Sequence, residues 1–248
     1  YATNAHIESL LLLKSGKSYD SDAVILSEKQ IDYATANNAM ETDNKLISNY
    51  DKAYNCSRNL TGGGYFECAI NVMLDGLGIV SKTWDNDYSQ IIVNNGYLDG
   101  SDIYDFDNSL YEVNSTLDFP NLNFSTASSN VKESYLNSIK ENIIKYGGSY
   151  VSTNICYSTL NYYNGVKTYV VDVMQGGGCV SDGYHALQII GWDDDFQYTV
   201  CKKTHGYVLP NECGSGGSVT GTGVWILKNS WGSSNSIFLL AYEIRRAS

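Results

Sequence analysis

The spacing of hydrophobic residues changes part way along the chain, from a helical period to a strand period. Before Gly147, apolar residues recur at the three- and four-residue intervals that are typical of helices with one buried face. After Gly148, short apolar and β-branched runs alternate with glycine, asparagine and aspartate, which is typical of strands and turns. The pattern therefore predicts an α+β chain, with a helical subdomain over residues 1–115 and a strand-rich subdomain over residues 116–248.

Local signals place the helices. Ser27 followed by Gln30 has the spacing of a capping box, in which a serine hydroxyl caps the first turn of a helix. Three glycines at 62–64 precede an apolar stretch that ends near Gly76. The predicted helices cover 1–13, a short segment from Ser27 past Tyr33, 66–74 and 133–146.

The strands are short and closely spaced. A glycine-rich stretch over 214–223 is expected to be a loop or a hairpin extension rather than a linker between domains. The predicted strands cover 150–155, 167–173, 185–192, 197–200, 224–228 and 237–244.

Composition excludes two classes of function. The net charge of −11, from 16 basic and 27 acidic residues, argues against binding to nucleic acid, which requires a positive surface. The longest clean apolar stretch, Leu10–Leu13, is far shorter than the roughly 20 residues of a membrane-spanning helix. We therefore expect no nucleic-acid partner and no insertion into a membrane.

Cysteines and glycosylation sequons favour an oxidising compartment. Six cysteines are present, and two pairs bracket polar, glycine-containing stretches at 56–68 and 201–213, as disulfides that clamp loops do. Secreted proteins carry N-glycans on Asn-X-Ser/Thr sequons. We expect a secreted or an endolysosomal or vacuolar protein. The sequons begin at Asn55, Asn59, Asn114 and Asn123.

Two motifs in the second half carry the candidate chemistry. His185 lies in Gly-Tyr-His-Ala-Leu-Gln-Ile-Ile-Gly-Trp, and Asn229 lies in Trp-Ile-Leu-Lys-Asn-Ser-Trp-Gly. Together they resemble the second half of a papain-like cysteine peptidase. The resemblance implies a two-subdomain fold with a helical half, an antiparallel β-barrel half and a cleft between them. A lone histidine at a strand edge is more often structural, but the Asn229 motif favours a catalytic role.

The resemblance also implies a role for each of these residues. His185 would be the general base, Asn229 would orient its ring, and Trp231 would shield the pair from water. Such a peptidase cleaves peptides or proteins through a thioester and needs neither a metal nor an organic cofactor.

Weaker matches extend the resemblance into the first half. Glu8 resembles a glutamate of the family's central helix, and Leu26-Ser-Glu-Lys-Gln resembles its Leu-Ser-Glu-Gln segment. Glycines in the first half would pair with an extended peptide, and neighbouring aromatic residues would select its side chain, although they could equally be core residues. The expected substrate-binding residues are Gly63, Gly64, Tyr65, Phe66, Gly183 and Tyr184.

The family's nucleophilic cysteine is not in these 248 residues. Aligned on Glu8, it would stand about three residues before Tyr1. Three interpretations follow: a peptidase whose nucleophile lies upstream, a processed two-chain enzyme whose nucleophile lies on a separate chain, or an inactive papain-like protein that binds peptides or has a structural role. The expected partners are a peptide or protein substrate and a separate N-terminal chain or propeptide. None of the six cysteines present is a convincing replacement.

Two groups of residues contain metal-ligand types. Cys201, His205 and Cys213 contain zinc-ligand types, but they lack a fourth ligand nearby, so a clamped loop is preferred. The acidic run 193–195 lacks the ligand spacing of a calcium loop, so a solvated turn after a strand is preferred. We therefore expect no metal site.

Overall fold

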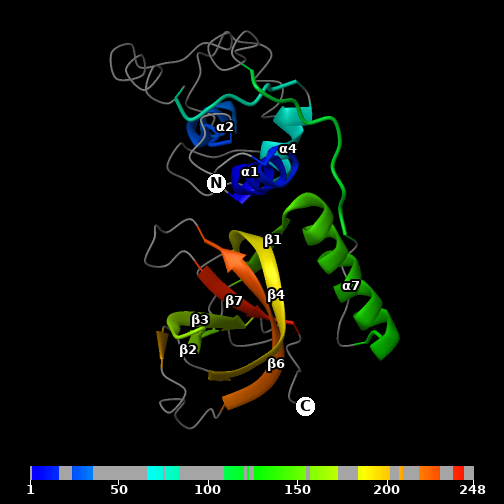
Figure 1. Ribbon diagram of the computed structural model, residues 1–248, viewed down its shortest axis with the longest axis vertical. Helices are drawn as coiled ribbons and strands as arrows, with labels where there is room; N and C mark the ends of the chain where they lie inside the picture. The colour runs from blue at the N-terminus through cyan, green and yellow to red at the C-terminus, as the bar shows by residue number, and fades with distance from the viewer. Residues whose placement is uncertain are drawn as a thin grey trace. The chain divides into compact units, whose positions relative to one another are not determined.

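The computed structural model divides the chain into two compact units, Thr3–Phe119 and Pro120–Ser248. Figure 1 shows the helices α1, α2 and α4 of the first unit and the helix α7 and sheet of the second. This mixed content confirms the α+β prediction. The structure describes residues 2–16, 24–35, 66–74, 76–83, 109–119, 122, 126–154, 157–172, 184–201, 207–208, 218–229 and 237–242.

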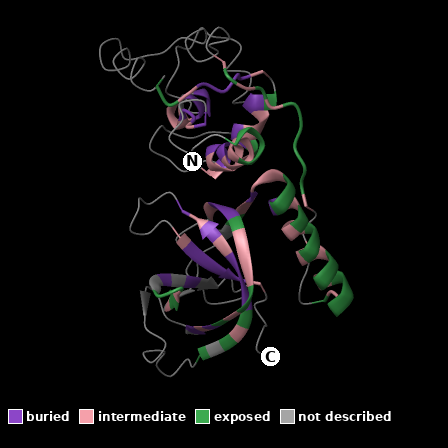
Figure 2. Ribbon diagram, viewed as in Figure 1, coloured by how far each residue is buried: buried purple, intermediate pink, exposed green. Residues whose placement is uncertain are grey.

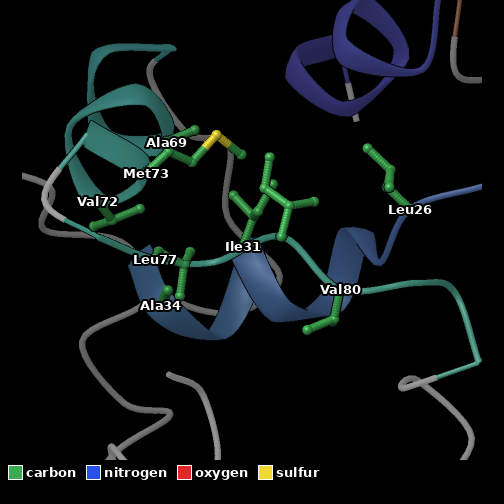
Figure 3. Packing of buried hydrophobic residues seen from close by; sticks show 9 residues of the cluster. Leu26, Ile31, Ala34, Ala69, Val72, Met73, Leu77 and Val80 are labelled. Atoms are coloured by element: carbon green, nitrogen blue, oxygen red, sulfur yellow. The ribbon is translucent and has the colours of Figure 1, made fainter. Parts of the chain in front are cut away.

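The first unit has a core shared by three helices and two extended segments. Helix α1 spans Ala2–Ser15, α2 spans Glu28–Thr35 and α4 spans Phe66–Leu74, each close to its predicted range. Their inward side chains meet in one apolar cluster, part of which is drawn in Figure 3. The buried members are Leu26, Ile31, Ala34, Ala69, Val72, Met73, Leu77, Ile79 and Val80.

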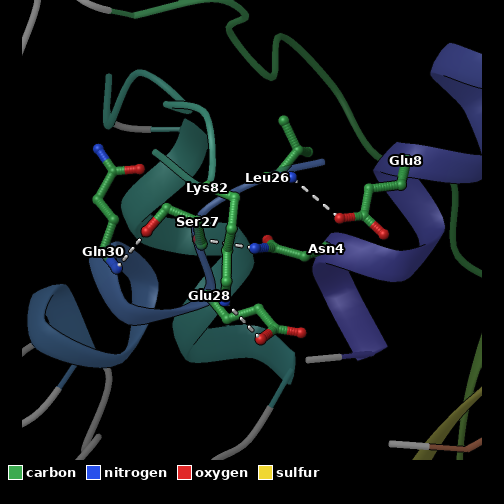
Figure 4. A network of polar contacts seen from close by, with 7 residues as sticks. All are labelled: Asn4, Glu8, Leu26, Ser27, Glu28, Gln30 and Lys82. Atoms are coloured by element: carbon green, nitrogen blue, oxygen red, sulfur yellow. Dashed lines mark hydrogen bonds and ion pairs between the residues drawn. The ribbon is translucent and has the colours of Figure 1, made fainter. Parts of the chain in front are cut away.

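Polar contacts fix the start of α2. The Gln30 backbone N–H donates to the Ser27 hydroxyl oxygen at 3.0 Å, as the capping-box spacing predicts (Figure 4). The Gln30 side chain also forms hydrogen bonds beyond its own helix. It donates to the Gly78 carbonyl at 2.7 Å and accepts from the Val80 backbone N–H at 3.3 Å. Gln30 is fully buried, so these bonds tie α2 to the segment after α4.

The second unit is a seven-stranded sheet with one long helix. Helix α7 spans Ser129–Tyr146 and ends at Gly147, whose φ of 81° suits a glycine C-cap. The strand order is β1-β4-β6-β7-β3-β2-β5, and all pairs are antiparallel except β3–β7 and β2–β5. The strands are β1 Ser149–Asn154, β2 Tyr157–Tyr163, β3 Val166–Asp172, β4 Tyr184–Cys201, β5 Tyr207–Val208, β6 Ser218–Lys228 and β7 Ile237–Ala241.

The sheet has an apolar cluster on each face. One cluster joins Leu187, Leu227 and Phe238 to Ile143 of α7, so α7 covers this face. The other face carries a second cluster in which Val170 of β3 packs with residues of β4, β6 and β7. Figure 2 shows buried residues along the central strands and mostly intermediate or exposed residues along α7. Two-sided burial explains the near-continuous apolar runs in these strands.

The sheet differs from the prediction in four respects. It is open within the described residues, with β1 and the two-residue β5 at its ends, so barrel closure is not shown. Strand β2 was missed. The ranges 185–192 and 197–200, predicted as separate strands, are one strand, because a bulge between Asp193 and Gln197 lets β4 continue. Strand β6 begins at Ser218 rather than at the predicted residue 224, because the end of the glycine-rich stretch pairs with the second half of β4 as a hairpin extension.

None of the helices in the described ranges is long and apolar enough to cross a membrane.

Candidate active site

Strand pairing brings the two candidate residues together. His185 is the second residue of β4, and Asn229 directly follows the last residue of β6. The two strands are antiparallel, with Gln188 opposite Lys228, so the start of β4 lies beside the end of β6. Residues 44 positions apart in sequence therefore become neighbours.

The pair is joined by a hydrogen bond of 2.8 Å between His185 Nε2 and Asn229 Oδ1. An amide oxygen only accepts, so Nε2 is the donor and carries a hydrogen in the neutral ring. The other nitrogen, Nδ1, then carries no hydrogen in the neutral ring. An amide partner of this kind fixes both the tautomer and the plane of the ring, which a general base requires.

The pair rests on the apolar face that α7 covers. Side chains two residues apart on a strand share a face, so His185 is on the face of Leu187, and Asn229 continues the row of Leu227. The two leucines are fully buried in the same cluster, and Asn229 is buried with 6% of its surface exposed. His185 is half-buried. The pair therefore lies next to an apolar floor of buried leucines, and the half-buried ring keeps some access to solvent.

A second histidine provides a contrast. His6 lies in α1, where burial lowers its pKa and so favours the neutral ring. Its Nδ1 is buried and has no hydrogen-bond partner. The two histidines that the structure describes therefore differ: a side-chain hydrogen bond orients the ring of His185, whereas His6 Nδ1 has no partner.

The remaining predicted site residues are placed only in part. Phe66 is the first residue of α4 and is half-buried, and Tyr184 is the first residue of β4, opposite Asn154 of β1. Phe66 belongs to the first unit, and Tyr184 directly precedes His185 in β4. Gly63, Gly64, Tyr65, Gly183 and Trp231 lie outside the described residues.

Glu8, the residue on which the resemblance is aligned in the first unit, has a structural contact. Its carboxylate Oε1 accepts the Leu26 backbone N–H at 3.0 Å, and the side chain is buried (Figure 4). One turn earlier, Asn4 Nδ2 donates to the Ser27 carbonyl at 2.7 Å. Both contacts fasten α1 to the segment that leads into α2.

Cys68 shows the bonding state of one of the six cysteines. Cys68 lies in the middle of α4, is buried and is disulfide-bonded, and no free cysteine occurs in the described ranges. A disulfide sulfur is not a thiolate nucleophile. This agrees with the expectation that Cys68 has a structural role.

The acidic run 193–195 is part of the sheet rather than a turn after it. The Asp193 carboxylate accepts the backbone N–H groups of Asp195 and Phe196, each at 3.0 Å, and so caps the bulge in β4. Asp194 pairs with Lys140 of α7 at 2.6 Å. Among the residues that the structure describes, no three acidic, histidine or cysteine side chains gather at one point. Two of the residues with zinc-ligand types, His205 and Cys213, lie outside the described residues.

Sequence reasoning missed the surroundings of the pair. Strand β1 was expected, but not that Thr153 stands opposite His185 as its neighbour on the other side. The apolar alternation around Leu187 and Leu227 was the available signal for the floor of the site. The partner of a strand is set by long-range packing, which a single sequence does not reveal.

Comparisons of the chain with protein-family models, curated proteins and solved structures found no match.

Proposed function

We propose that the chain forms most of a papain-like cysteine peptidase and that His185 and Asn229 are its base and its orienting residue. The observation that carries the proposal is the 2.8 Å contact between His185 Nε2 and Asn229 Oδ1 at the joined ends of two strands. In this proposal the open sheet and α7 form the barrel-like half and the first unit forms the helical half.

The nucleophile in this proposal is a cysteine outside the 248 residues, about three residues before Tyr1 by alignment on Glu8. His185 Nδ1 takes the thiol proton, and the thiolate attacks the carbonyl carbon of a peptide bond. The imidazolium then gives that proton to the leaving amine, and the C–N bond breaks to leave a thioester. Water, deprotonated by His185, cleaves the thioester and restores the thiol.

The orientation of the ring follows from the contact with Asn229. Because Nε2 donates to Oδ1, Nδ1 is the nitrogen available for this proton transfer. Asn229 keeps the ring in that position whether it is neutral or protonated, since Nε2 carries a hydrogen in both states. Trp231, outside the described residues, would cover the bond from water.

Hydrolysis of a mixed peptide library by the complete gene product in reducing buffer tests the proposal. His185→Ala is expected to lower the rate by about 100- to 10,000-fold, the usual contribution of a general base. Asn229→Ala is expected to lower it as well, because the ring loses its fixed plane. The matched control is Asn161→Ala, which removes an amide bonded to the Thr199 backbone elsewhere in the same sheet and is expected to leave the rate unchanged.

A second candidate function is an inactive papain-like protein that binds peptides or serves as a structural surface protein. Cys68 of α4 is buried and disulfide-bonded, so it does not supply the thiolate that a peptidase needs. This second candidate predicts that the folded complete product binds fluorescent peptides without cleaving them, and that His185→Ala changes neither property.

A further inference from the structure

The segment 109–119 of the first unit carries a feature that peptide hydrolysis does not use. This segment is held by a short bridge to residue 79: the Ile79 N–H donates to the Tyr111 carbonyl, and the Leu110 N–H donates to the Ile79 carbonyl, each at 2.8 Å. Tyr111 and Val113 pack against the core of the unit, whereas Glu112 between them is exposed. The segment therefore presents alternate side chains to the core and to solvent, as extended chains do.

Asn114 is the next outward position. It is exposed, and every residue from Asn114 to Asp118 is exposed as well. Asn114-Ser115-Thr116 is a complete glycosylation sequon, with the threonine hydroxyl that the acceptor motif requires. Among the four sequons, the asparagine of this one lies within the described residues, and the asparagines of the other three lie outside them.

We propose that Asn114 is an N-glycosylation site. The donor is an oligosaccharide linked to a polyprenyl pyrophosphate. The bond between the first sugar's anomeric carbon and the pyrophosphate oxygen breaks, a bond from that carbon to Asn114 Nδ2 forms, and the amide nitrogen loses one proton. The polyprenyl pyrophosphate leaves, and no oxidation or reduction takes place.

The local structure accommodates this modification without loss of the fold. A glycan is bulky and hydrated, so it is tolerated only where the folded chain leaves its asparagine at the surface. The backbone bonds to Ile79 lie at residues 110 and 111, three or more positions before Asn114, so a glycan there leaves this bridge in place.

The test is secretion of the full chain from eukaryotic cells behind a standard secretion leader, followed by peptide mapping. Enzymatic removal of the glycan in heavy-oxygen water converts a glycosylated asparagine into a labelled aspartate. We expect the label at residue 114. Asn114→Gln and Thr116→Ala should both abolish it, and the matched control Ser115→Ala should retain it because the middle position of a sequon is permissive.

The leader supplies the compartment, so the result does not depend on peptidase activity. An unmodified Asn114 in the secreted, folded protein would overturn the proposal, whether or not another sequon is occupied. Label at residue 114 that persists in Thr116→Ala would also contradict it, because the modification would then not depend on the sequon.

Discussion

The contact between His185 and Asn229 predicts an energetic coupling that a double-mutant cycle measures. The perturbations are His185→Ala, Asn229→Ala and the double variant. Because Asn229 is buried and its Oδ1 accepts the imidazole N–H at 2.8 Å, each single change leaves the partner group without this bond. Both changes together remove donor and acceptor at once.

The structure sets the expected size of the effect. A buried polar group that loses its partner costs about 1–3 kcal/mol, whereas the net value of a hydrogen bond is about 0.5–1.5 kcal/mol. The double variant should therefore be less destabilised than the sum of the single variants, by about 0.5–1.5 kcal/mol.

Urea unfolding followed by tryptophan fluorescence provides the assay, since Trp192 and Trp225 pack with the apolar cluster under the pair. The control cycle combines His185→Ala with Asn161→Ala, whose amide bonds to Thr199 near the other end of β4. That cycle should be additive within about 0.5 kcal/mol. If the His185 and Asn229 cycle is equally additive, the two side chains do not interact in solution and the proposed catalytic pair is refuted.

Three further predictions concern stability. Gly223→Ala should lower the free energy of unfolding more than Gly165→Ala does. Both glycines have a positive φ, whose strain costs about 1–3 kcal/mol for another residue, but only a Cβ at Gly223 would meet a neighbour, the Tyr242 ring at 2.5 Å. Thermal unfolding of the two variants measures the difference. Lys140→Met should destabilise by about 1 kcal/mol through lost cation–π contacts and a half-exposed ion pair. The Lys140 hydrogen bond holds the pKa of Asp194 below its ordinary 3.8. The stability that the ion pair contributes should therefore be present at neutral pH and shrink as pH falls below 3.8. Unfolding of the wild-type and Lys140→Met proteins over a series of acidic pH values measures it. Gln30→Leu should cost about 1–3 kcal/mol by leaving a buried carbonyl and N–H unpaired, which chemical denaturation measures.

Local signals were sufficient for the helices. The Ser27 hydroxyl forms the predicted cap bond, and α7 ends where Gly147 follows it. These signals act between residues a few positions apart, so a single sequence contains all the information. Helix α7 starts at Ser129, four residues before the predicted residue 133, because helix boundaries are the part of a helix that a sequence specifies least well.

Strands were predicted less completely because their pairing depends on distant residues. Strand β2 is polar and tyrosine-rich, yet it pairs with β3 through a turn at Asn164 and Gly165, whose φ angles are 48° and 78°. An Asn-Gly pair is the strongest short-range hairpin signal and would have revealed β2.

The glycine-rich stretch left a loop and a hairpin extension both open, and the pairing of β6 with β4 shows the hairpin extension. A Cβ at Gly221 would lie 2.3 Å from the Tyr198 hydroxyl, and one at Gly223 would meet the ring of Tyr242. These glycines admit aromatic rings against the strand rather than form a loop. From sequence alone, the two uses of glycine look the same.

The sequence predicts the two site residues, His185 and Asn229, but not the residues that surround them. Each lies in a recognisable motif, and the structure joins them by a hydrogen bond. The neighbouring strand β1 and the buried floor of Leu187 and Leu227 follow from strand register, which no local pattern specifies.

The most direct test of the peptidase hypothesis is selective alkylation of the complete native protein by a thiol-directed epoxide, read by intact mass, N-terminal sequencing and peptide mapping. The hypothesis predicts one modified cysteine, about three residues before Tyr1, whose labelling is lost in His185→Ala and kept in Asn161→Ala. A different residue at that position, with no labelled cysteine on this or a partner chain, would contradict it. Labelling that is indifferent to His185 would contradict it equally.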